Sequence, residues 1–276
     1  MRIENFLIIG GTGKTGRKIV ESLQQLGQNV RVGSRSATPS FDWAQPETWE
    51  QALEGIDKVY ITFQPDLAVP GAYEAIKALT QKAKEKGVKK LVLLSGKGET
   101  EAEKCETLVM NSGVNYTIIR ASWFNQNFSE SFFLDPILSG HVALPFPKAK
   151  VPYVDTGDIA DVAVETLLHD EHNEHIYELT GPRLWTFEEV TQEIAKASNR
   201  EIQFTAVTKE EYIGFMKEAG VHEDYVWLMD YLFTHVLVNP ANSIVTGDVE
   251  KVLKRKAKDF SEYVEQTAAT GVWNIN

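Results

Sequence analysis

Short apolar runs alternate with stretches of helical periodicity through the first 120 residues of the chain. Between the runs, apolar residues recur three and four positions apart, as at Ile19, Leu23 and Leu26. Strands that alternate with helices indicate β-α-β units, and right-handed crossovers turn such units into a doubly wound parallel sheet of the α/β class. The runs predict strands at residues 6–9, 30–32, 59–63, 91–94 and 116–119.

The chain after residue 120 has a different pattern. A helix is predicted over residues 159–167, and short strands are expected at 176–179 and 202–204. Thr186 and Thr208 each precede a glutamate by three positions, which is the capping-box spacing that opens a helix. Helices are therefore expected to dominate this part of the chain.

The composition of the chain excludes several classes of function. Lysine and arginine number 28 against 39 acidic residues, and the resulting net charge of −11 argues against nucleic acid as a partner. The one cysteine, Cys105, excludes a disulfide framework and a cysteine-based zinc site. No apolar run approaches the roughly 20 residues of a membrane helix, and the first residues lack a signal-peptide core. We expect a cytoplasmic protein that contacts no membrane.

Three glycines, at residues 10, 13 and 16, lie between the first predicted strand and its helix. Gly10 permits a tight turn, Gly13 lets a pyrophosphate approach the backbone, and Gly16 lets the helix pack close to the strand. The N-terminus of that helix adds free N–H groups and the positive end of the helix dipole. A dinucleotide-binding turn is predicted, and its candidate cofactor-binding residues are Gly10, Thr12, Gly13, Lys14, Thr15 and Gly16.

Neither an internal repeat nor a flexible linker divides the chain. We expect one unit over residues 1–276. Within it, residues 1–120 form the dinucleotide-binding core, and residues 121–276 form a smaller mixed, mostly helical lobe for a substrate or a partner.

The glycine turn, IIGGTGKTG, resembles the start of the NmrA-like branch of the atypical short-chain dehydrogenases/reductases. Four further segments resemble that family in the right order: SGVNYTIIR at 112–120, WFNQNF at 123–128, VDTGDIA at 154–160 and ELTGP at 178–182. The tail, with Trp273, is similar to ergot-alkaloid-type reductases. The resemblance covers essentially the whole chain and implies a Rossmann fold that binds NAD(P)(H). It does not fix an activity, because the family holds quinone and dye reductases as well as catalytically silent redox sensors.

The segment after the second predicted strand favours NADP(H) over NAD(H). Proteins that prefer NAD place an acidic residue there for the ribose 2′-hydroxyl, whereas this chain has Ser34, Arg35 and Ser36. A guanidinium flanked by hydroxyls suits a 2′-phosphate, which arginine binds through two parallel hydrogen bonds. Arg35 and Ser36 are therefore cofactor-binding candidates. By resemblance, Asp42 is expected to accept a hydrogen bond from the adenine amine.

Two strand ends are expected to flank the nicotinamide half of the cofactor. Ligands of open α/β sheets bind in the crevice outside the carboxyl ends of the strands. The candidates at these ends are Thr62, Phe63, Gln64, Ser95 and Gly96.

No side-chain proton donor is recognisable. The Tyr-x-x-x-Lys pattern of short-chain reductases occurs as Tyr73 and Lys77, but it precedes the strand at 91–94 instead of following it, and we interpret Tyr73 as structural. By resemblance, the next helix should carry lysine or histidine four residues before Glu106, where this chain has Ala102. The catalytic residues are therefore unknown, although a bound cofactor carries the hydride chemistry itself.

Aromatic and amide side chains follow the strand at 116–119 and suit a flat apolar ligand. Trp123, Phe124 and Asn127 are the substrate-binding candidates, with ordinary core packing of the aromatic rings as the alternative. Histidines also recur every three residues, at 169, 172 and 175. Their hydrophilic surroundings favour a solvated turn, and no metal site is expected.

These features predict an NADP(H)-dependent oxidoreductase that transfers hydride to a small aromatic, quinone-like or imine acceptor. The alternative is a non-enzymatic NADP(H)-binding redox sensor that acts through a protein partner. The absent proton donor and the acidic composition keep this alternative open. Whether the chain forms a homodimer or binds another protein stays open.

Overall fold

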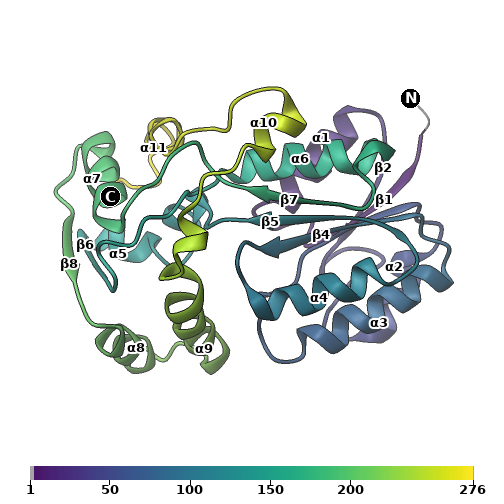
Figure 1. Ribbon diagram of the computed structural model, residues 1–276, viewed down its shortest axis with the longest axis horizontal. Coiled ribbons are helices and arrows are strands. Elements are labelled where there is room, and N and C mark those ends of the chain that lie inside the picture. The colour runs from purple at the N-terminus through teal and green to yellow at the C-terminus, as the bar shows by residue number, and fades with distance from the viewer. Residues whose placement is uncertain (1–2, 276) are drawn as a thin grey trace. The chain divides into compact units, whose positions relative to one another are not determined.

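The computed structural model describes residues 3–275 (Figure 1). The chain divides into two compact units. The first comprises the residues up to Ala121 together with Gly157–Glu178, and the second comprises Ser122–Thr156 together with the residues from Leu179 onward. Residues 157–178 were expected in the C-terminal lobe. They belong instead to the first unit, because their strand completes its sheet beside the strand that ends at Ala121.

The first unit is built on a six-stranded sheet in the order β2-β1-β3-β4-β5-β7. Its strands are β1 (Asn5–Ile9), β2 (Asn29–Gly33), β3 (Lys58–Ile61), β4 (Lys90–Gly96), β5 (Asn115–Ala121) and β7 (His175–Leu179). All neighbouring pairs from β2 to β5 are parallel, which confirms the predicted α/β sheet. The order changes direction between β1 and β3, and in such sheets ligands bind at that point, outside the carboxyl ends of the strands.

Helices cover both faces of this sheet, as a doubly wound fold requires. The helices α1 and α6 lie on one face, and α3 and α4 lie on the other (Figure 1). Ile19 and Leu23 on α1 and Ile76 on α3 are buried as predicted, whereas Leu26, just past the end of α1, is 48% exposed. The helices of the first unit are α1 (Gly16–Gln25), α2 (Trp49–Leu53), α3 (Ala72–Glu85), α4 (Thr100–Met110) and α6 (Thr156–Leu168).

The second unit pairs β6 (His141–Leu144) with β8 (Gln203–Ala206) in parallel and is otherwise mostly helical. Its helices are α5 (Leu134–Ser139), α7 (Phe187–Ser198), α8 (Lys209–Glu218), α9 (Glu223–Tyr231), α10 (Asp248–Leu253) and α11 (Phe260–Ala268). Both predicted capping boxes form, at Thr186 before α7 and at Thr208 before α8. Aromatic residues fill the core, where the Trp273 indole donates to the Phe128 carbonyl at 2.8 Å. Across residues 3–275, no helix has the length and apolar content needed to span a membrane.

Candidate functional site

The turn between β1 and α1 has no space for a Cβ at Gly10, Gly11 or Gly16. Gly10 has a φ of +71°, in the left-handed region, and a Cβ there would overlap the Thr62 hydroxyl. A Cβ on Gly16 would lie 2.7 Å from the carbonyl carbon of Gly10 and 2.8 Å from the Cα of Gly11. Because these neighbours are backbone atoms, α1 packs against the turn with no space for a larger residue.

Gly13 lies in a roomier part of the same turn. Its N–H donates to the Gly10 carbonyl at 2.8 Å, and a Cβ on Gly13 would meet only that oxygen, at 3.1 Å. Its φ is not in the left-handed region. Packing inside the protein therefore does not demand glycine here. Close approach of a ligand such as a pyrophosphate to the backbone would demand it, as predicted for Gly13.

Within the described part of the chain, no side chain caps the start of α1. Its N-cap residue, Thr15, makes no side-chain bond to the helix, and the Thr15 Oγ1 instead accepts from the Tyr60 hydroxyl at 2.9 Å. Burial raises the pKa of Tyr60, so this phenol keeps its proton. The first turn contains no acidic residue. The N–H groups of a helix start, with the positive end of the dipole, bind phosphate groups well.

The turn after β2 lies beside the glycine turn, because the Gly10 N–H donates to the Gly33 carbonyl at 2.9 Å. Arg35 is exposed, and the hydroxyl oxygens of Ser34 and Ser36 lie 3.3 Å apart. Residues 33–41 include no acidic side chain. The turn thus offers one guanidinium and two hydroxyls, without a carboxylate that would repel a phosphate.

An aromatic cluster fixes the next segment onto the end of β3. The Trp43 indole donates to the Thr62 carbonyl at 3.1 Å, and its ring centroid lies 4.8 Å from that of Phe63. Asp42 is held by its own turn, in which its Oδ1 accepts from the Ala44 N–H at 3.0 Å. The structure therefore brings Asp42, Thr62 and Phe63 together at one edge of the sheet. Their contacts with a cofactor stay predictions.

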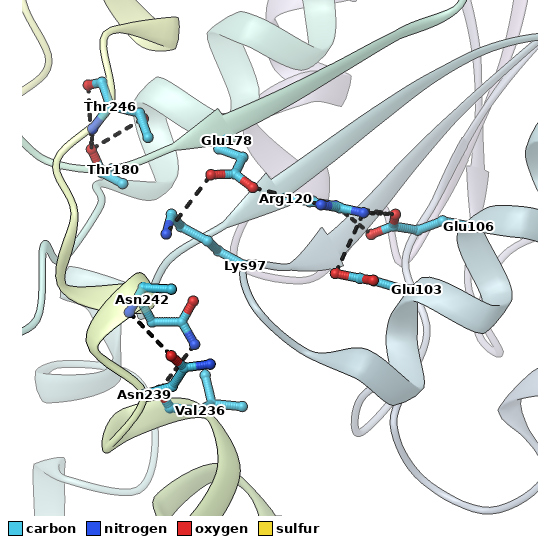
Figure 2. Close-up of polar contacts among 11 residues, drawn as sticks. Lys97, Glu103, Glu106, Arg120, Glu178, Thr180, Val236, Asn239, Asn242 and Thr246 are labelled. Atoms are coloured by element: carbon cyan, nitrogen blue, oxygen red, sulfur yellow. Dashed lines mark hydrogen bonds and ion pairs between the residues drawn. The ribbon is translucent and has the colours of Figure 1, made fainter.

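Ser95 is turned toward α4. Its hydroxyl donates to Oε1 of Glu106 at 2.6 Å, and this fully buried carboxylate also accepts from Arg120 at 2.7–3.1 Å. Figure 2 shows how Arg120 lies between Glu106 and Glu178, which is 3.6 Å away, while Lys97 lies 3.8 Å from the same Glu178. The Ser95 side chain thus joins β4 to α4 through Glu106. A contact between Ser95 and a cofactor would involve its backbone.

A pair of carboxyl groups at this edge of the sheet was not predicted from the sequence. Asp66 follows β3, Glu99 follows β4, and their side chains are hydrogen-bonded to each other. A sequence signal existed, because both residues lie a few positions beyond the ends of two predicted strands. Neighbouring parallel strands bring such residues to the same edge of a sheet.

The substrate-binding candidates lie in the second unit. Trp123 is partly buried, and its ring lies 5.9 Å from those of both Phe187 and Phe233. Phe124 is half-buried and forms a β-bridge with Val154. Trp123 therefore forms part of the aromatic core of this unit. A role in substrate binding for Trp123, Phe124 and Asn127 stays a prediction.

The structure also places Tyr73 and the histidine series. Tyr73 is 42% exposed on α3 beside a surface groove, and it precedes β4, as predicted. His172 corrects the expected solvated turn, because it is only 8% exposed and its Nδ1 lies 2.8 Å from the Tyr177 hydroxyl. Burial lowers the pKa of His172. Within residues 3–275, no three histidine, cysteine or acidic side chains gather to hold a metal ion.

The parallel sheet, the glycine turn and the uncapped α1 define a dinucleotide-binding protein of the Rossmann class. Residues 10–170 match the NAD(P)H-binding family, and the chain belongs to that family. Among its relatives it resembles the NmrA-like atypical short-chain dehydrogenases/reductases.

Several relatives of known name align over nearly the full length of the chain. Prestalk A differentiation protein A of Dictyostelium discoideum is 28% identical over 95% of this chain and 92% of its own. The NAD(P)H azoreductase of Xenophilus azovorans is 28% identical over 95% and 98%. Agroclavine dehydrogenase of Claviceps fusiformis is 28% identical over 92% and 91%.

Solved structures share the fold at lower identity. The NADPH-dependent quinone oxidoreductase of Escherichia coli has a TM-score of 0.78 at 20% identity, covering 95% of this chain and 99% of that one. The triphenylmethane reductase of Citrobacter sp., complexed with NADP(H), has a TM-score of 0.76 at 19% identity and the same coverage. The negative transcriptional regulator NmrA, in complex with NAD, has a TM-score of 0.72 at 15% identity over both full chains.

Proposed function

We propose that the protein is an NADP(H)-dependent oxidoreductase that transfers hydride to a small flat acceptor of the quinone, azo or imine type. The observation that carries this proposal is the β1–α1 turn, which is closed by Gly10 and Gly16 and roomy at Gly13. When bound, NADPH supplies the hydride. The chain supplies the phosphate cradle and the strand ends that orient the reacting half of the cofactor.

The preference for NADP(H) rests on Arg35. A 2′-phosphate carries close to two negative charges, and a charge-assisted hydrogen bond contributes roughly 1.5–3 kcal/mol. At about 1.4 kcal/mol per decade, one arginine contact favours NADP(H) over NAD(H) by roughly 10–100-fold. Because Arg35 is exposed, added salt should weaken this preference.

Dissociation constants of both nucleotides test the cofactor assignment. Arg35→Ala should weaken NADPH binding by roughly 10–100-fold and leave NADH binding nearly unchanged, since NADH has no 2′-phosphate. Arg255→Ala, at an exposed arginine of the second unit, is the matched control. Equal wild-type affinities for the two nucleotides, or loss of both nucleotides in Arg35→Ala, would contradict the assignment.

The named relatives support a reductase. One is called an azoreductase and another a dehydrogenase, and a structural neighbour is a quinone oxidoreductase. Neighbours with regulatory names, including a negative transcriptional regulator, keep the redox sensor as the second candidate.

Turnover separates the two functions. A reductase should oxidise NADPH with at least one member of a panel of quinones, azo dyes, cationic dyes and imines. A sensor should show no turnover across that panel but should bind a protein partner with an affinity that changes between NADP⁺ and NADPH, as linkage demands.

A further inference from the structure

Asp66 and Glu99 form a carboxyl pair at the carboxyl edge of the sheet. They follow the adjacent strands β3 and β4, and their side chains share a hydrogen bond. Glu99 is 7% exposed, and its Oε2 has no hydrogen-bond partner among the described residues. The second carboxyl oxygen, Oε1, lies against Gly96, where any Cβ would overlap it. The carboxyl group of Glu99 therefore packs onto the end of β4. Asp66 is the more exposed member.

Helix capping does not account for this arrangement. Glu99 is the N-cap residue of α4, the position from which a side chain commonly accepts a bond from the first helical turn. Its side chain makes no such bond and meets Asp66 instead. Leaving a buried carboxyl oxygen without a partner costs stability.

The surroundings favour one proton on the pair. Two carboxylates in contact repel each other, so the doubly ionised pair is disfavoured, and burial raises the pKa of Glu99 well above its usual range. Asp66 accepts a bond from the Ala68 N–H at 2.8 Å, so Asp66 is the acceptor of the pair and Glu99 the donor.

The charged and titratable groups of α4 do not neutralise the pair. Glu106 engages Ser95 and Arg120, and Lys104 bonds to Glu101 near the exposed side of α4. The Cys105 thiol is uncharged, since burial raises its pKa to about 12.

We propose that Asp66 and Glu99 hold one proton between them and pass it to the acceptor as the acceptor is reduced. This inference rests on the proposed oxidoreductase function. Asp66, the more exposed member, is the residue that would contact the acceptor, and Glu99 is a positioning residue that holds the proton. The place fits, because these strand ends are where the sheet binds the reacting half of a dinucleotide.

The step balances for a quinone. The quinone gains a hydride from NADPH and one proton from the pair, which yields hydroquinone and NADP⁺ and leaves both carboxyls ionised. A phenolate-type anion, with a conjugate-acid pKa of about 10, is basic enough to take that proton. Water then returns a proton to the pair. A cationic triarylmethane dye differs, because a carbocation becomes neutral on accepting hydride alone and needs no proton.

This difference gives a selective test. Asp66→Asn and Glu99→Gln preserve the shape of the side chains. They should lower kcat for a benzoquinone by about 100-fold, the usual scale of general acid catalysis, and leave kcat for a cationic triarylmethane dye within about twofold. Glu101→Gln, at a partly exposed carboxyl on the same helix, should leave both rates unchanged. The double variant should be no slower than either single variant, because the pair acts as a unit.

Infrared spectroscopy provides a readout that does not depend on turnover. The wild-type protein at pH 7 should show the C=O absorption of a protonated carboxyl group, and Glu99→Gln should lack it while Glu101→Gln retains it. Absence of this absorption in the wild type overturns the shared proton. Equal slowing of quinone and dye reduction, or no slowing of either, overturns proton delivery. A wild-type protein that shows the absorption and reduces neither acceptor refutes the proposed function, and proton delivery with it, while the shared proton stands.

Discussion

Glycine-to-alanine substitutions at two positions of the β1–α1 turn should have different effects. Gly16→Ala should lower the thermal stability of the protein, whereas Gly13→Ala should lower its affinity for the nucleotide. In Gly16→Ala, the new Cβ would lie 2.7–2.8 Å from two backbone atoms of the turn. Overpacking of this kind costs about 1–3 kcal/mol, or more where backbone must move. For a chain of this size, that cost corresponds to a fall in Tm of roughly 2–12 °C.

Gly13→Ala should leave the fold nearly unchanged. The new Cβ would touch only the Gly10 carbonyl oxygen, at 3.1 Å, and the backbone of Gly13 is not left-handed. Alanine at such a position also restricts the unfolded chain, which offsets the contact by about 0.4–1 kcal/mol. The Cβ would, however, keep a pyrophosphate away from the backbone. Losing two charge-assisted hydrogen bonds of about 1.5–3 kcal/mol each weakens binding by at least about 100-fold.

Two measurements separate these effects. Thermal unfolding without nucleotide should place the Tm of Gly13→Ala near that of the wild type and the Tm of Gly16→Ala below both. Calorimetric titration with NADPH, at a temperature where all three proteins are folded, should then show the loss of affinity in Gly13→Ala. Wild-type affinity in that variant would refute the cradle at Gly13, and a Tm as low as that of Gly16→Ala would refute the packing argument.

Three further predictions concern stability. Glu106→Gln removes the fully buried charge that faces Arg120 and should cost about 3 kcal/mol in urea unfolding, whereas Glu101→Gln should cost little. Thr186→Ala removes the capping box of α7 and should cost about 1 kcal/mol in the same assay. The raised pKa of Glu99 means that the folded state binds more protons than the unfolded state at pH values between the unfolded and folded pKa. The wild type should therefore lose stability as pH rises above about 4.5, and Glu99→Gln should lose less over the same range. Identical pH profiles would contradict that assignment.

The sheet was predictable because each of its signals is local. A buried strand such as β1 shows as an unbroken apolar run, and a helix such as α1 shows as a 3.6-residue period with glycine at its C-terminal end. The grouping of residues 157–178 was not predictable, because the partner of a strand is chosen across the whole chain. Nothing in the local sequence of β7 indicates that it pairs with β5.

The glycine turn could also be predicted from local sequence, whereas the contact between Asp66 and Glu99 could not. Gly10, Gly13 and Gly16 lie within seven residues, so spacing alone predicts the turn. Asp66 and Glu99 are 33 positions apart, and only strand order brings them into contact. Ser95 lies at a strand end, as predicted. The direction of its hydroxyl was not predictable, because the hydroxyl donates to Glu106 on α4, eleven residues further along the chain.

The carboxyl pair also bears on the choice between reductase and sensor. A sensor needs a nucleotide site and a surface that responds to it, and both are available without placing two carboxyl groups in contact inside the protein. Keeping Glu99 buried with an unpartnered oxygen costs about 1–3 kcal/mol, a large share of the stability of a domain. Local rules are broken in this way mainly where function requires it. A held proton has a use in reduction, because hydride addition to a neutral acceptor creates an anion that must be protonated. The proton donor missing from the helix position at Ala102 is thus supplied, in our proposal, from the strand ends.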